Sequence, residues 1–86
     1  MKETGYTTEL TPSGIRSFPN GDQARIEKLY IKESGEEEVR LSRWKNGKML
    51  PRPLDLSEDD LLILFRDALS KDVFTPAFRM VLRTML

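Results

Sequence analysis

The sequence contains no cysteine and no histidine among its 86 residues. Without cysteine the chain can form neither a disulfide framework nor a thiolate metal site. Without histidine it lacks the commonest general base and the commonest zinc ligand. No window approaches the ~18 apolar residues that a membrane span needs, and the first residues carry no signal-like apolar segment. We therefore expect a cytoplasmic protein away from the membrane, with no metal and no cofactor.

Carboxylates are the remaining candidates for catalysis. Glu58, Asp59 and Asp60 are adjacent, and a second acidic run covers residues 36–38. Adjacent helical residues point in different directions, and negative charge in a first helical turn is explained by the helix dipole. A Ser–Lys pair remains formally possible as nucleophile and base, but no glycine-rich phosphate loop is present. The sequence predicts a protein that is not an enzyme.

Length and charge distribution favour a partner. A single domain of this size buries a modest fraction of its surface, which favours a homo-oligomer or a bound protein. The net charge is zero, yet residues 15–54 hold nine Lys/Arg against six Asp/Glu. A basic middle indicates an anionic partner, whereas overall neutrality argues against strong non-specific nucleic-acid binding.

The dipeptide Asn46-Gly47 is the strongest local signal. Both residues tolerate positive φ, which a two-residue type I′ hairpin turn requires. The second arm of this hairpin would end at Leu56. Without a bulge, the register places Lys45 and Lys48 beside the turn and sets Trp44 opposite Met49 and Val39 opposite Leu54.

Four strands are predicted. Their ranges are Ile15–Phe18, Arg25–Glu33, Glu38–Trp44 and Met49–Leu56. Pro51 and Pro53 cannot donate ladder hydrogen bonds, so the fourth strand should lie at an edge or be irregular. Residues 1–13 are polar and threonine-rich, and we expect them to form a flexible N-terminal arm.

Two helices should follow the sheet. Ser57 is a good N-cap for a helix over residues 57–70, whose leucines and Phe65 form a broad apolar face. Thr75 and Pro76 are typical of a second helix start. Its apolar residues follow at i, i+3, i+4 and i+7, namely Phe78, Val81, Leu82 and Met85. The predicted fold class is α+β: residues 14–86 form one domain with a four-stranded antiparallel sheet and one or two C-terminal helices, assembled as a dimer.

Strand alternation predicts one face that mixes cations and rings. This face would carry Arg16, Phe18, Lys28, Tyr30, Lys32, Arg40 and Trp44, while Leu29, Ile31, Val39 and Leu41 would pack on the helix. Cations that follow phosphates and rings that stack on bases are what single-stranded nucleic acid needs. A solvated sheet face and a dimer interface remain the alternatives, and the pattern depends on the register.

Residues 25–69 also resemble a known family. Leu41-Ser42-Arg43-Trp44, the Asn-Gly-Lys turn and Leu56-Ser57-Glu58 look like the PC4-type transcriptional coactivator domain, in a small bacterial or phage form. The resemblance implies a curved four-stranded sheet, a helix and a homodimer that holds single-stranded DNA on the sheet. The chain departs from the family pattern in having Pro53-Leu54-Asp55 where a basic-Gly step is usual, and in its second helix.

The residues and the resemblance together predict a non-catalytic single-stranded nucleic-acid-binding protein with an accessory role in transcription or replication. The partner would be single-stranded DNA or RNA. The candidate binding residues are Lys28, Tyr30, Lys32, Arg40, Arg43, Trp44, Lys45, Lys48 and Arg52. The alternative is a small regulatory protein-interaction module, because the apolar helices exceed what a four-stranded sheet needs to cover it.

Overall fold

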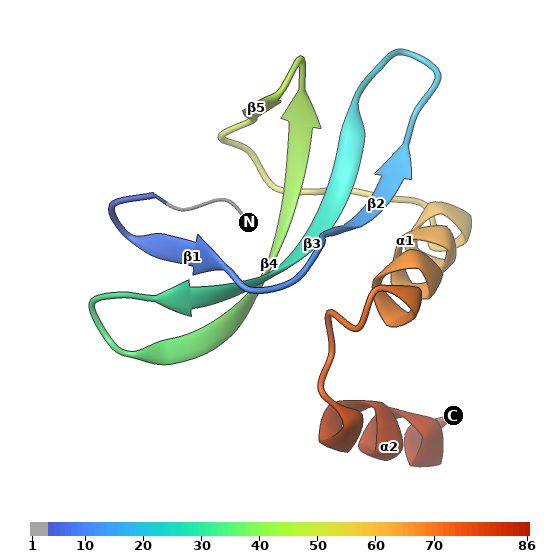
Figure 1. Ribbon diagram of the computed structural model, residues 1–86. Helices are drawn as coiled ribbons and strands as arrows, with labels where there is room; N and C mark the ends of the chain where they lie inside the picture. Colours follow the sequence, from blue (N-terminus) through green and yellow to red (C-terminus); the bar gives the residue numbers. More distant parts are fainter. Residues whose placement is uncertain (1–3) are drawn as a thin grey trace.

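The computed structural model describes residues 4–86 as an antiparallel sheet followed by two helices (Figure 1). This architecture confirms the predicted α+β fold class. The strands are β1 (Thr7–Glu9), β2 (Gly14–Ser17), β3 (Gln23–Ile31), β4 (Glu36–Lys45) and β5 (Lys48–Met49). The helices are α1 (Glu58–Ser70) and α2 (Pro76–Met85). Within residues 4–86, neither helix has the length and apolar character of a membrane span.

Strand β3 is the centre of the sheet. Its first half pairs with β2 and its second half with β1, both on the same edge. On the other edge β4 pairs with β3 along its whole length, from Gln23↔Trp44 to Ile31↔Glu36. Strand β5 then adds only two pairs to the end of β4. The long β3–β4 hairpin is therefore the frame on which every other strand is placed.

The Asn46-Gly47 turn forms as predicted. Asn46 and Gly47 have φ of 50° and 76°, and the turn sets Trp44 opposite Met49. The rest of the predicted fourth strand is wrong, because β5 stops at Met49. The prolines that follow remove ladder donors, and the chain turns away toward α1 (Figure 1). Within residues 4–86, Val39 therefore has no strand partner on the β5 side, and on its other side it lies opposite Lys28 of β3.

The predicted flexible arm, residues 1–13, also needs correction, because part of it forms β1. Thr7–Glu9 pairs with Leu29–Ile31, and the Lys32 N–H donates to the Tyr6 carbonyl at 2.8 Å. Backbone pairing requires no apolar side chains, so a polar, threonine-rich segment can add to a sheet edge. The first three residues of the predicted arm lie outside the described residues.

Helix α1 covers one face of β2 and β3 and closes the core. The buried cluster consists of Ala24, Ile26, Leu64, Ala68, Val73 and Phe74. The Ser57 hydroxyl caps α1 by accepting from the Asp60 N–H at 3.1 Å, as predicted. Leu54 and Leu56 of the linker pack against the same cluster. The linker that was predicted to be strand therefore contributes to the core as an irregular segment.

Helix α2 begins as predicted but packs loosely. The Thr75 hydroxyl accepts from the Phe78 N–H at 3.2 Å, and Pro76 occupies the first turn. None of its ten residues, all of which the structure describes, is buried. Its contact with the core is the ring of Phe78, whose centroid lies 4.9 Å from that of Phe74. Figure 1 shows α2 lying apart from the sheet, beyond α1.

Candidate functional site

The register of the β3–β4 hairpin divides the residues of the predicted face of cations and aromatic rings between the two faces of the sheet. Lys28 and Tyr30 lie opposite Val39 and Glu37, whereas Arg40 lies opposite Glu27. Residues that oppose each other point to the same side of an antiparallel sheet. Lys28 and Tyr30 are therefore on the face that α1 covers at its other end, which we call the helix face. Arg40 and Trp44 are on the opposite face, which we call the open face.

The prediction that the cations and rings of β3 and β4 share one face is wrong because of how the two strands are paired. Alternation along β3 and along β4 is as predicted, but the turn that joins Ile31 to Glu36 sets even-numbered residues of β3 against odd-numbered residues of β4. Ala24 and Ile26 are the β3 residues that α1 buries. Leu29, which the sequence analysis assigned to the helix face, is buried on the open face. Because β3 has buried aliphatic residues on both faces, its pattern alone does not identify which face packs on the helix.

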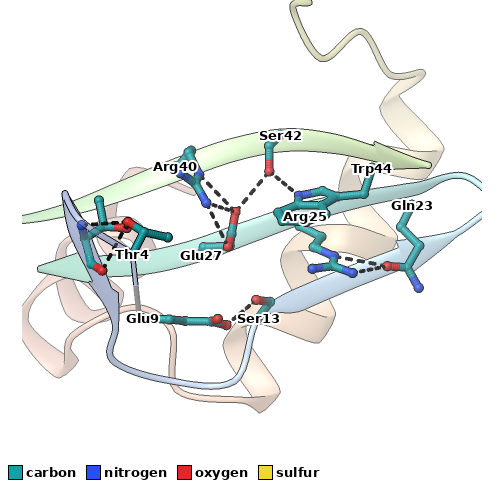
Figure 2. A network of polar contacts seen from close by, with 10 residues as sticks. Thr4, Glu9, Ser13, Gln23, Arg25, Glu27, Arg40, Ser42 and Trp44 are labelled. Carbon is teal, nitrogen blue, oxygen red and sulfur yellow. Dashed lines mark hydrogen bonds and ion pairs between the residues drawn. The ribbon is translucent and has the colours of Figure 1, made fainter. Parts of the chain in front are cut away.

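Trp44 is a covered residue of the open face. The residue is only 6% exposed, and its indole Nε1–H donates to Ser42 Oγ at 2.8 Å. The guanidinium of Arg25 lies over the ring, 4.0 Å from its centroid, and two bonds to Gln23 Oε1 hold that guanidinium in place (Figure 2). A base would have to displace Arg25 in order to stack on this ring.

Glu27 is the centre of the polar network on the open face (Figure 2). Its side chain is 3% exposed, and it accepts from Arg40 Nε at 3.0 Å and Arg40 Nη2 at 3.1 Å. Ser42 Oγ donates to the same carboxylate at 3.0 Å and accepts from Trp44. A buried carboxylate with a bidentate arginine is costly to break, because the remaining charge would be left unpaired. Arg40 is therefore engaged in a contact within the fold.

Three further candidate cations also have partners within the chain. Arg43 Nε bonds Asp22 Oδ2 at 3.1 Å, and its guanidinium lies 4.8 Å from the centroid of the Phe18 ring. Lys28 Nζ lies 3.5 Å from Glu37 Oε1. Lys32 Nζ donates to the Thr4 carbonyl at 2.7 Å, which ties β3 to the segment before β1. Tyr30 is 40% exposed on the helix face, away from Trp44.

The remaining candidate cations lie beside the β4–β5 turn and in the linker that follows it. Lys45 and Lys48 flank the hairpin turn and are exposed, and Arg52 is exposed in the linker that follows. Within residues 4–86 none of these three forms an ion pair. We call Lys45, Lys48 and Arg52, which lie within eight residues of one another along the chain, the hairpin-tip cluster.

An apolar groove lies on the helix face, between β4 and α2. Its volume is about 550 Å³. Its floor and walls are formed by Ile26, Val39, Leu41, Phe65, Val73, Phe74 and Phe78, and Lys28, Glu37, Glu38 and Thr75 complete its lining. Val39 and Leu41 are 44% and 50% exposed, because α1 covers β2 and β3 but leaves β4 open. Strand alternation instead predicts that both residues pack on the helix.

The outward face of α2 continues this apolar surface. Phe78 lines the groove at 47% exposure, and Val81 and Met85 follow it one and two turns later at 59% and 74% exposure. Monomeric proteins rarely expose contiguous apolar surface of this kind without an interaction purpose. The i, i+3, i+4, i+7 spacing in the sequence is the signal that identifies this face, and the structure leaves it unpacked.

One carboxylate at the junction of β2 and α1 titrates abnormally. Lys71 Nζ lies 2.8 Å from Asp67 Oδ2, and the Ile15 N–H donates to the same oxygen at 2.6 Å. The hydrogen bond from Lys71 is the main cause that lowers the pKa of Asp67 below its ordinary value, with the Ile15 N–H adding to the effect. These contacts hold the edge of β2 against α1, so the Asp67 carboxylate has a structural role.

The described residues show no metal-binding cluster of acidic side chains. Residues 4–86 contain no group of three or more acidic side chains placed to hold a metal ion. Comparison with protein-family models, with curated proteins and with solved structures gives no match. The resemblance to the PC4-type domain therefore stays a prediction, and any functional assignment depends on the groove and the hairpin-tip cluster.

Proposed function

We propose that this protein is a non-catalytic interaction module that binds an amphipathic helix of a partner protein in the groove between β4 and α2. The observation that supports this function most directly is the pairing of a formed apolar groove with an unpacked apolar helix face. Helix-in-groove recognition uses apolar anchors at i, i+3, i+4 and i+7 on the bound helix. The proposal includes a cytoplasmic location, as the composition predicts.

The rim of the groove defines the charge of the partner. Glu37 and Glu38 line it at the start of β4, and Lys28 is already paired with Glu37, so the charge that remains on the rim is negative. An acidic rim around an apolar floor selects a helix whose apolar stripe is flanked by Lys or Arg. Rim charges of this type steer association more than they add affinity, so the apolar anchors provide most of the binding energy.

A synthetic amphipathic peptide tests the proposal. The peptide carries Leu at i, i+3, i+4 and i+7 with Lys elsewhere, and a scrambled peptide of the same composition serves as reference. We expect amide shifts in the protein's NMR spectrum to move around Val39, Leu41 and Phe78 with the amphipathic peptide alone. Leu41→Asp should abolish the response. Leu62→Asp is the matched control, because Leu62 is 62% exposed on α1 and does not line the groove.

The hairpin-tip cluster supports a second function, binding of single-stranded DNA or RNA by a homodimer in transcription or replication. Exposed Lys and Arg side chains that form no ion pair within the described part of the chain can contact the phosphates of a nucleic acid, with an affinity that falls as salt rises. We expect Lys45→Ala combined with Lys48→Ala to weaken oligonucleotide binding and to flatten its salt dependence. Equal affinity and equal salt slope for the wild type and this double variant would remove nucleic acid from consideration.

A further inference from the structure

The outer edge of β4 is open over most of its length. Strand β4 runs from Glu36 to Lys45, but β5 pairs only with Trp44 and Lys45. The Leu50 N–H extends this pairing by one bond, to the Arg43 carbonyl at 2.7 Å. Within residues 4–86, no backbone hydrogen bond reaches the outer side of Glu36–Ser42. Exposed edges of this length are ready templates for another strand.

The bond to Arg43 identifies the groups that face outward. Alternate residues of a strand direct their N–H and C=O groups to the same edge. Because Arg43 faces the β5 side and the β3–β4 register has no bulge, Leu41, Val39 and Glu37 direct their backbone groups to the open edge as well. A second strand laid antiparallel along this edge would therefore form hydrogen bonds with three residues of β4.

The charges along this edge select a second copy of the same strand. When two copies of β4 are placed antiparallel with Val39 opposite Val39 of the partner, Glu38 lies opposite the partner's Arg40, and Arg40 lies opposite the partner's Glu38. Cross-strand pairs of opposite charge stabilise an antiparallel ladder, and like charges directly opposite destabilise it. Arg40 keeps its bidentate bond to Glu27 in this arrangement, and its partly exposed guanidinium faces the partner's Glu38 in addition. In the same register Glu37 lies opposite Leu41, and Glu36 lies opposite Ser42.

Neighbouring registers either oppose like charges or overlap with β5. Centring the pair on Glu38 or on Arg40 sets like charges opposite each other, and centring it on Glu37 sets Glu36 against Glu38 as well. Centring it on Leu41 extends the pairing into Arg43 and Trp44, where β5 already occupies the edge. The register centred on Val39 is the one that uses the whole free edge and avoids both conflicts.

We propose that the chain forms a symmetric dimer in which β4 pairs antiparallel with β4 of a second copy, centred on Val39, to give one continuous sheet. Val39 and Leu41 of both copies then lie side by side on the helix face, which reduces their exposure to water. The proposal does not depend on the groove binding a partner helix, because the edge lies in the plane of the sheet and the groove lies above it.

Single-cysteine variants test this register, since the native chain has no cysteine. Opposed Cα atoms of a hydrogen-bonded antiparallel pair are about 5.5 Å apart, which is within disulfide range. We expect Val39→Cys to form a cross-linked dimer under mild oxidation. Glu37→Cys and Leu41→Cys should each form no covalent cross-link alone, because four residues of strand separate the two copies of each thiol by about 13 Å. Their mixture should cross-link.

A proline variant tests the same interface without a thiol. The Val39 N–H faces the open edge, so Val39→Pro removes a donor to the second copy while leaving the β3 ladder bonds in place. We expect sedimentation to give a dimer for the wild type and a monomer for Val39→Pro, with unchanged far-UV circular dichroism. Lys48→Ala at the hairpin tip is the control, and it should stay dimeric.

The outcomes that would overturn the proposal are specific. Sedimentation of the wild-type chain as a monomer would contradict the proposed dimer. Cross-linking of Leu41→Cys with itself at the rate of Val39→Cys would show a different register. Peptide binding in the groove by a protein that is monomeric would sustain the proposed function while rejecting the β4 pairing, so the two failures are distinguishable.

Discussion

Gly14 of β2 lies directly against Ala68 of α1. A Cβ atom at position 14 would come within 2.6 Å of the Ala68 Cβ and 2.7 Å of its Cα. Both residues are buried, and the contact permits α1 to sit close on the sheet while the Asp67 carboxylate reaches the Ile15 N–H. The helix that defines the core is thus positioned by a pair of small residues.

Gly14→Ala should destabilise the protein by about 1–3 kcal/mol, the usual cost of overpacking a closed contact. The added methyl group meets helix backbone as well as side chain, so neither neighbour can rotate away. Urea denaturation followed by circular dichroism measures the change. Gly5→Ala is the control, because a Cβ there meets nothing within 4 Å. Equal stability of the two variants would contradict the close packing of α1.

Glu27→Ala should cost about 3–5 kcal/mol, because it leaves the Arg40 guanidinium without its carboxylate. Ser42 Oγ, which accepts from the Trp44 indole, loses its own acceptor in the same change. Denaturant unfolding followed by Trp44 emission measures both the stability and the loss of order around the ring. Glu36→Ala removes an exposed carboxylate from the neighbouring strand and is expected to change stability little.

Phe74 and Phe78 separate the core from the groove. Phe74 is 7% exposed and Phe78 is 47% exposed, although their rings are in contact. Phe74→Ala should lower the free energy of unfolding by about 3–5 kcal/mol. Phe78→Ala should lower it far less, while reducing binding of the amphipathic peptide. Thermal melts together with the peptide titration check this division, and a larger stability loss at Phe78 would indicate that α2 is part of the core.

Asp67 should contribute to acid sensitivity. Lys71 and the Ile15 N–H lower its folded-state pKa below the ordinary value of 3.8, so the unfolded state takes up the proton first as the pH falls. The stabilisation is complete above pH 3.8 and is lost as the pH falls through the lower folded-state pKa. Asp67→Asn should flatten the stability profile in this acidic window. Parallel pH profiles for the wild type and the variant would contradict the assignment.

Trp44 should report folding and not ligand stacking. Its ring is covered by Arg25 and bonded through Nε1, so acrylamide should quench it weakly in the native protein and strongly after unfolding. Addition of a single-stranded oligonucleotide should leave its emission unquenched, even if the hairpin-tip cluster binds phosphate. Strong, salt-sensitive quenching by the oligonucleotide would instead indicate that a base stacks on the Trp44 ring.

Local chemistry made several elements predictable. Positive φ at Asn46 and Gly47, the Ser57 and Thr75 caps and the 3.6-residue spacing in both helices depend on residues close in sequence. These signals identified the β4–β5 turn, both helix starts and the α+β class. The unpacked apolar face of α2 was visible for the same reason, as a stripe of residues at helical spacing.

The sequence by itself determined where the chain turns, where its helices begin and which residues alternate along each strand, because those properties depend on neighbours a few residues apart. The tertiary structure decided which face of β3 meets α1, that Trp44 and Arg40 join a network around Glu27, and that β4 keeps a free edge. A shift of one residue between two strands moves every side chain to the other face at no local cost. The turn between Ile31 and Glu36 fixes that register. The burial of Ala24 and Ile26 beneath α1, more than 30 residues further along the chain, decides which face of β3 is covered.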